Sequence, residues 1–79
     1  MPLFYLHRRI DGQRFLDPEG EEFPDIASAI EDAKLSVKEY LAERLRRGEP
    51  LNGDSFEIWS TEEVMVAEIH FKDVLNWRE

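Results

Sequence analysis

Aromatic and branched side chains alternate with polar ones from Leu3 to Ile10, which predicts a strand with one buried face. The dipeptide Asp11-Gly12 follows, and Asp-Gly is a strong signal for a tight hairpin turn. Residues 14–16 are therefore expected to return antiparallel to the first strand. Residues 17–20 then read as a second turn, and residues 21–23 are expected to add a short extended piece.

The next segment has the periodicity of an amphipathic helix. Its apolar side chains recur at steps of three or four residues: Ile26, Ile30, Ala33, Val37, Leu41 and Leu45, with Tyr40 beside them. Asp25 is the expected N-cap, and Gly48 is expected to end the helix in the left-handed conformation. The pattern predicts one long helix that buries this face.

Two more extended segments follow the helix, residues 55–60 and 64–71, with a polar turn at residues 61–63. They predict a second hairpin. Its second strand is expected to face the helix with alternate residues: Met65, Ala67, Ile69 and Phe71. Asp73 is expected to cap a short last turn, which places Val74, Leu75 or Trp77 over an end of the core.

The order of these elements predicts a single small α+β domain over residues 1–79. We expect a four-stranded antiparallel sheet made from two hairpins, with one long helix on one face (ββαββ). The strand order stays open. His7 and His70 are neighbours only if the first and last strands pair.

Composition narrows the class of protein. The chain has 79 residues, no cysteine and 42% hydrophobic residues, so it is expected to fold without disulfides or thiolate metal sites. It contains no apolar run long enough for a signal peptide or a membrane span, and we expect a cytoplasmic location without membrane contact.

The net charge of -8 repels phosphates and disfavours nucleic-acid binding. The arginines near residues 8–14 and 44–47 are interpreted as a solvated hairpin and as partners of the helix dipole.

No catalytic or cofactor motif is present in the sequence. His7 and His70 are the only side chains suited to act as neutral general bases near pH 7 without a large pKa shift. Both fall on the strand faces turned away from the helix, where Glu57 or Glu68 could join them around a metal. We expect surface or interface histidines instead, with no catalytic residue, no cofactor and no metal.

Large apolar side chains on the helix-free face indicate an interaction surface. The candidate residues share that face: Tyr5, His7, Trp59, Val64, Val66 and His70. A domain this small also gains stability by self-association. We therefore expect a homodimer, formed either through this face or through the end of the helix at Leu41 and Leu45, which extends past the sheet.

Several short motifs together resemble a family of short uncharacterised bacterial proteins. The motifs follow in chain order: Phe4-Tyr5-Leu6-His7, Glu19-Gly20, Phe23-Pro24-Asp25, Phe56-Glu57-Ile58 and Phe71-Lys72-Asp73. The resemblance implies a fold and no activity. The first half is also similar in shape to HicB-type antitoxins, in which two strands lead through Pro-Asp into a helix.

The leading hypothesis is a small non-catalytic module that binds a protein through the helix-free face or a sheet edge. The alternative is an antitoxin-like regulator that binds a basic toxin or a nucleic-acid partner. An acidic body can mask a basic toxin by electrostatic complementarity.

Overall fold

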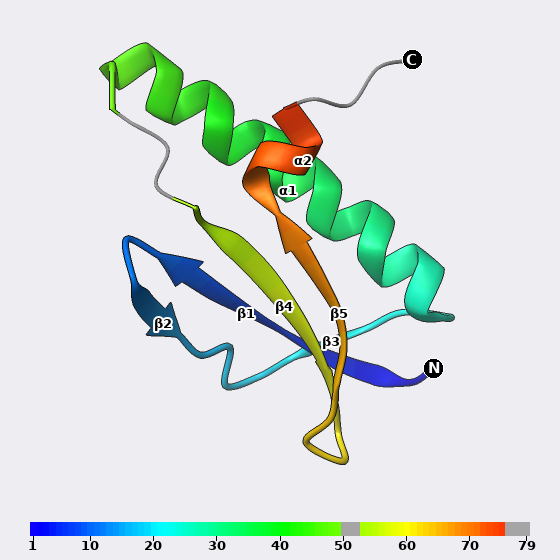
Figure 1. The fold of residues 1–79 in the computed structure, drawn as a ribbon. Helices are drawn as coiled ribbons and strands as arrows, with labels where there is room; N and C mark the ends of the chain where they lie inside the picture. The colour runs from blue at the N-terminus through cyan, green and yellow to red at the C-terminus, as the bar shows by residue number, and fades with distance from the viewer. Residues whose placement is uncertain (50–52, 76–79) are drawn as a thin grey trace.

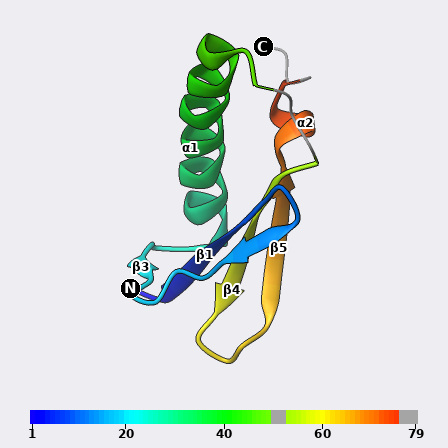
Figure 2. The same cartoon turned by 90° about the vertical axis from the view of Figure 1, so that its left-hand side faces the viewer.

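The computed structural model describes residues 1–49 and 53–75 (Figure 1). Its elements follow in chain order: β1 (Leu3–Ile10), β2 (Gln13–Phe15), β3 (Glu21–Glu22), α1 (Ile26–Arg47), β4 (Ser55–Ser60), β5 (Met65–His70) and α2 (Phe71–Leu75). The fold is α+β, with α1 standing on one side of an antiparallel sheet (Figure 2). The helix packs on β4, β5 and α2.

Among the residues that the structure describes, the sheet has five strands, not the four expected from the sequence. Its order is β2-β1-β4-β5, and β3 also pairs with β1. Because β4 occupies one edge of β1, β2 and β3 share the other edge, opposite different ends of β1. The outer strand is thus broken in two by residues 16–20. The prediction of two hairpins was incomplete because β3 consists of only two residues.

The pairing of β1 with β4 decides which residues meet. β4 lies between β1 and β5 in the sheet. His7 pairs with Glu57, and Ser55 pairs with His70 on the far side. The first and last long strands therefore do not pair, and the two histidines are not neighbours.

Both ends of α1 are as expected. The Asp25 carboxylate accepts a hydrogen bond from the Ser28 N–H at 2.8 Å, as an N-cap does. Gly48 ends the helix with a φ of 69°, and its N–H donates to the Leu45 carbonyl. The helix is therefore delimited by local chemistry at both ends.

The buried face of α1 differs from the predicted one at its ends. Its buried residues are Ala29, Ala33, Val37, Leu41 and Arg44. Ile26 is 42% exposed and Leu45 is 62% exposed, so both predictions were wrong. The first turn instead presents the small Ala29 to the core, and the last turn presents Arg44.

The core lies between α1 and the sheet, and α2 closes one end of it. Phe71 is 1% exposed and contacts Tyr40 and Phe56 edge-on, with ring centroids 5.2 Å apart in both pairs. Val74 is buried over this end of the core, as expected. The expected cap at Asp73 was wrong, because α2 begins at Phe71 and Asp73 lies inside it. Met65 is 45% exposed, in contrast to Ala67 and Ile69, which pack on or in the core. The prediction for Trp77 falls outside the described residues.

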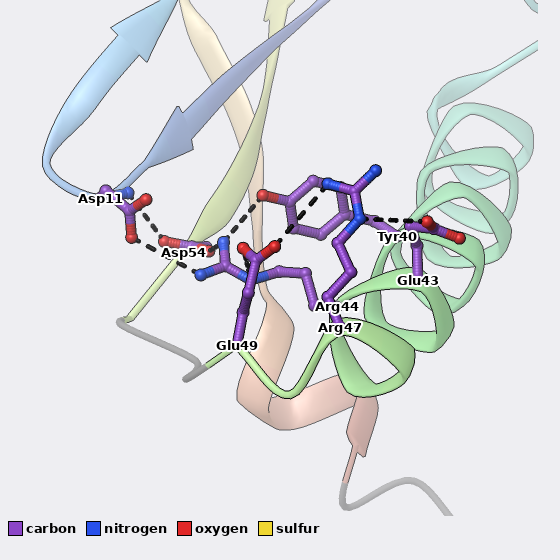
Figure 3. Close-up of polar contacts among 7 residues, drawn as sticks. All are labelled: Asp11, Tyr40, Glu43, Arg44, Arg47, Glu49 and Asp54. Carbon is purple, nitrogen blue, oxygen red and sulfur yellow. Dashed lines mark hydrogen bonds and ion pairs between the residues drawn. The ribbon is translucent and has the colours of Figure 1, made fainter.

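A buried ion pair joins the end of α1 to the sheet (Figure 3). The Arg44 guanidinium donates to the Asp54 carboxylate at 3.0 Å and to the Tyr40 hydroxyl at 2.8 Å. The other Asp54 oxygen accepts the Asp11 N–H from the β1–β2 turn. The Asp54 carbonyl accepts the Phe71 N–H at the start of α2. Four segments therefore meet at one carboxylate residue.

The sequence interpretation of the helix arginines holds for two of the three. Arg46 and Arg47 are exposed and pair with Glu43 on the same helix, at 3.2 Å each. Arg44 is 5% exposed and has a tertiary partner instead. Its position on the buried side of the helix, next to Asp54, explains the difference.

The two faces of α1 can be separated by stability measurements. Val37→Ala should lower the free energy of unfolding by about 1–3 kcal/mol, because buried apolar contacts are lost. Leu45→Ala should change it by less than about 0.5 kcal/mol, because that side chain is exposed. Urea melts of both variants check the ranking. Equal costs would contradict the assigned face.

Candidate interaction face

Alternate residues of each strand point to the helix-free side of the sheet. These residues are Tyr5, His7 and Arg9 from β1, Ser55, Glu57 and Trp59 from β4, and Glu68 and His70 from β5. Val66 lies at the register shift between β4 and β5 and packs against the core. The β1–β4 register sets Tyr5 beside Trp59 and His7 beside Glu57. Residues from both ends of the chain thus form one surface.

Three of the sequence-predicted residues come together on this surface. The rings of Tyr5 and His7 are stacked with centroids 6.2 Å apart, and those of His7 and Trp59 are 5.9 Å apart. All three side chains are half-buried. They form a continuous aromatic row across β1 and β4.

The other three predicted residues do not join this row. Val64 is 53% exposed and precedes β5 in the turn, and Val66 is half-buried on β5. His70 lies at the opposite end of β5, where its Nε2 is 3.5 Å from a Glu68 oxygen. His70 is therefore separated from the aromatic row, whereas Val64 and Val66 lie beside the end of β4 that carries Trp59.

A buried glutamate supports the aromatic row. The sequence placed Glu57 on this face, near a histidine, but did not predict its burial. Glu57 is 5% exposed although it faces away from the helix. Its Oε1 accepts the Trp59 indole N–H at 2.9 Å and lies 3.1 Å from the Arg14 guanidinium. Its Oε2 lies 3.5 Å from Arg9. The carboxylate is thus covered by two arginines and holds the indole in place.

Arg14 also covers one face of Trp59. Its guanidinium carbon lies 5.0 Å from the ring centroid, a distance typical of a cation–π contact. The only sequence signal for this cluster is that the alternation of β1 and β4 puts Arg9 and Glu57 on the same face. A glutamate on a helix-free face is normally solvated, so the signal alone does not reveal burial.

His7 is held by the loop between β2 and β3. The Asp17 N–H donates to the His7 Nδ1 at 2.9 Å, while the Asp17 carboxylate accepts the Leu6 N–H at 3.2 Å. Because Nδ1 is an acceptor, the neutral ring carries its proton on Nε2. Burial and the nearby Arg14 lower the pKa of His7. In the neutral ring, Nε2 is therefore an N–H donor and not a free base.

Gly20 lets the loop between β2 and β3 lie close to β1. Its φ is 73°, in the region that favours glycine. A Cβ at this position would lie 3.0 Å from the Phe4 carbonyl oxygen and 3.1 Å from the Tyr5 ring. Only glycine therefore allows the loop to pack beside Tyr5 in this way.

An open groove of about 300 Å³ runs over the aromatic row. Tyr5, His7 and Trp59 form part of its lining. Two loops supply the rest of the lining: Leu16, Asp17 and Pro18 between β2 and β3, and Ser60, Thr61 and Glu63 around the β4–β5 turn. The groove therefore combines aromatic faces, one oriented N–H donor and acidic side chains.

Ser55 is 1% exposed, and its hydroxyl donates to Glu68 at 3.1 Å and not to a histidine. Within residues 1–49 and 53–75, no three acidic or histidine side chains are grouped so as to hold a metal ion. In the same part of the chain, no helix is both long and apolar enough to span a membrane.

Comparison with known proteins identifies the family of the chain. The model of a domain of unknown function, DUF6894, matches residues 3–72, which is most of the chain. The chain belongs to the DUF6894 family. This confirms the resemblance to an uncharacterised family, and it brings no assigned activity. No curated protein and no solved structure gives a significant match, so the similarity to HicB-type antitoxins gains no support.

The state of His7 can be tested by NMR. The pKa of His7 should lie below the ordinary histidine value, and Arg14→Gln should raise it because a nearby positive charge is removed. Arg8→Gln is the matched control, because Arg8 lies on the opposite face of β1, over Phe15. Titration of the His7 ring resonances measures the shift. Equal pKa values in the wild type and Arg14→Gln would contradict the assigned contact.

The lowered pKa of His7 also determines how the stability of the fold changes with pH. A histidine whose pKa is lower in the folded state resists protonation there, so it stabilises the fold at neutral pH. This contribution should be lost as the pH falls from the ordinary histidine pKa toward the lowered one. Urea melts between those two pH values should show a smaller pH dependence in His7→Gln than in the wild type.

Proposed function

We propose that this DUF6894 protein is a non-catalytic interaction module that binds an extended segment of a partner protein. The bound segment lies in the groove over Tyr5, His7 and Trp59. The observation that carries the proposal is this aromatic row on an open sheet face, with the His7 N–H donor fixed within it. Tyrosine and tryptophan are the side chains that contribute most often to binding energy at protein interfaces.

The groove is organised before any partner binds. Glu57 and Arg14 hold Trp59 from two sides, and the Asp17 N–H fixes the ring of His7. Binding to such a surface does not have to order these side chains, which reduces its entropic cost. The aromatic rings supply contact area, and the His7 N–H is suited to a backbone carbonyl of the segment.

Charge favours a segment that is not acidic. Asp17 and Glu63 line the groove, and the whole chain has a net charge of -8. The two arginines of the face, Arg9 and Arg14, are already paired with Glu57. An acidic groove of this kind repels phosphates and attracts basic segments. These charges support a protein partner over a nucleic acid.

The antitoxin-like alternative shares this electrostatic argument, since a basic toxin is one kind of basic partner. No separate contact in the structure favours it. A basic nuclease among the identified partners would support that alternative, and other proteins with basic segments would support the general module. The expected cytoplasmic location stays a prediction.

Selection from a display library of short random peptides tests the groove. Leu16 is 63% exposed and lines the groove, whereas Leu45 is 62% exposed and lies on α1. Peptides selected on the wild type should bind Leu16→Glu at least about tenfold more weakly and Leu45→Glu equally well. They should also shift the NMR signals of the Trp59 and His7 side chains.

Two results would overturn the proposal. In one, the wild type selects no peptide above the background of an unrelated protein. In the other, the selected peptides bind Leu16→Glu as tightly as the wild type and leave the aromatic signals unchanged. Both variants change exposed positions, so circular dichroism should show the same fold in each.

A further inference from the structure

A second groove lies on the helix side of the sheet and shares no lining residue with the aromatic groove. Its volume is about 390 Å³, and it runs between α1, the outer strand β5 and α2. Apolar side chains from all three elements line it, among them Ile30, Ile69 and Val74. A hollow of this size on a small domain leaves apolar area uncovered.

Leu35 stands in the lining of this groove and is 58% exposed. It lies on a different side of α1 from the buried line through Ala33 and Val37. The chain thus carries both an apolar hollow and, beside it, an exposed apolar side chain. An isologous contact between two copies needs both features, because each copy inserts its side chain into the hollow of the other copy.

We propose that the occupant of this groove is α1 of a second copy of the chain. The two helices pack antiparallel about a two-fold axis near Lys34 and Leu35. Each Leu35 enters the groove of the other copy. The proposal does not depend on the function proposed for the aromatic groove.

The charges beside Leu35 favour this occupant. Glu31 and Lys38 both line the groove, two helical turns apart, and they lie on either side of the Lys34-Leu35 pair. In an antiparallel arrangement about that pair, Glu31 faces Lys38 of the partner subunit, and Lys38 faces the partner's Glu31. A parallel arrangement would place like charges together, which is unfavourable. Glu31 and Lys38 are therefore complementary between two copies in the antiparallel orientation and not in the parallel one.

Pairing through sheet edges is a weaker route to self-association. The β2–β3 edge is interrupted by residues 16–20. On the other edge, the pairing of β5 with β4 shifts register between Ile58 and Trp59, and Glu68 adds a charge. Short, irregular or charged edges resist the addition of another strand. At the end of the helix, Leu41 is already buried at 4% exposure, so of the two leucines expected there Leu45, at 62%, is left for such a contact.

Analytical ultracentrifugation of the full chain tests the proposal. At about 100 μM the wild type should sediment with a mass near twice 9.4 kDa. Leu35→Glu should raise the dissociation constant at least about tenfold, because a charge then enters the apolar groove. Leu45→Glu is the matched control, since it changes an equally exposed leucine of α1 outside the groove, and it should leave the constant unchanged.

Charge reversal tests the orientation. Glu31→Lys and Lys38→Glu should each weaken the dimer at least about tenfold, because each creates like-charge pairs across the axis. The double variant E31K/K38E should restore the dissociation constant to within about threefold of the wild type, since it rebuilds both pairs with exchanged signs. Circular dichroism should show equal helix content in all variants.

Three outcomes would overturn the proposal. The first is a wild-type chain that stays monomeric at every concentration. The second is a dimer that Leu35→Glu and Leu45→Glu weaken equally. The third is a double variant that dissociates as readily as the single ones.

Discussion

The buried pair of Arg44 and Asp54 is the contact on which the arrangement of helix and sheet depends. The Asp54 side chain is 1% exposed, so its charge is stable there only with a close partner. Arg44, in the last turn of α1, is that partner, and its guanidinium also donates a hydrogen bond to the Tyr40 hydroxyl. The same aspartate accepts a backbone N–H from the β1–β2 turn, and its carbonyl binds the start of α2. The pair therefore fixes the end of α1 against the sheet, and the opposite sheet face stays open for the aromatic groove.

Features that depend on neighbouring residues were predictable from the sequence. The Asp11-Gly12 turn, the Asp25 cap and the Gly48 cap are local, and all three are present. Features that depend on distant partners were not. Arg44 was interpreted as a partner of the helix dipole because its tertiary partner, Asp54, is not recognisable from spacing. Residues 21–23 were expected to be extended, but the pairing of β3 with β1 was not predicted for the same reason, since it depends on a distant strand.

The candidate site shows the same division between local pattern and tertiary register. Alternation correctly placed Tyr5, His7 and Trp59 on the helix-free side, because strand periodicity is a local property. It did not show that β4 lies beside β1, and this register is what brings Trp59 to His7 and separates His7 from His70. The burial of Glu57 was not predicted, because one of the side chains that contact it, Arg14, comes from a third strand. A polar cluster whose residues come from three strands cannot be recognised from the pattern of any one segment of the sequence.

A double-mutant cycle on Arg44 and Asp54 tests the central claim most directly. Urea melts would compare Arg44→Met, Asp54→Asn and the double variant with the wild type. Asn keeps the oxygen that accepts the Asp11 N–H, so the cycle isolates the ion pair. We predict that each single variant is strongly destabilised and that the double variant is no less stable than Arg44→Met alone, because no buried charge is then left unpaired. Strictly additive losses of stability would contradict the role assigned to this pair.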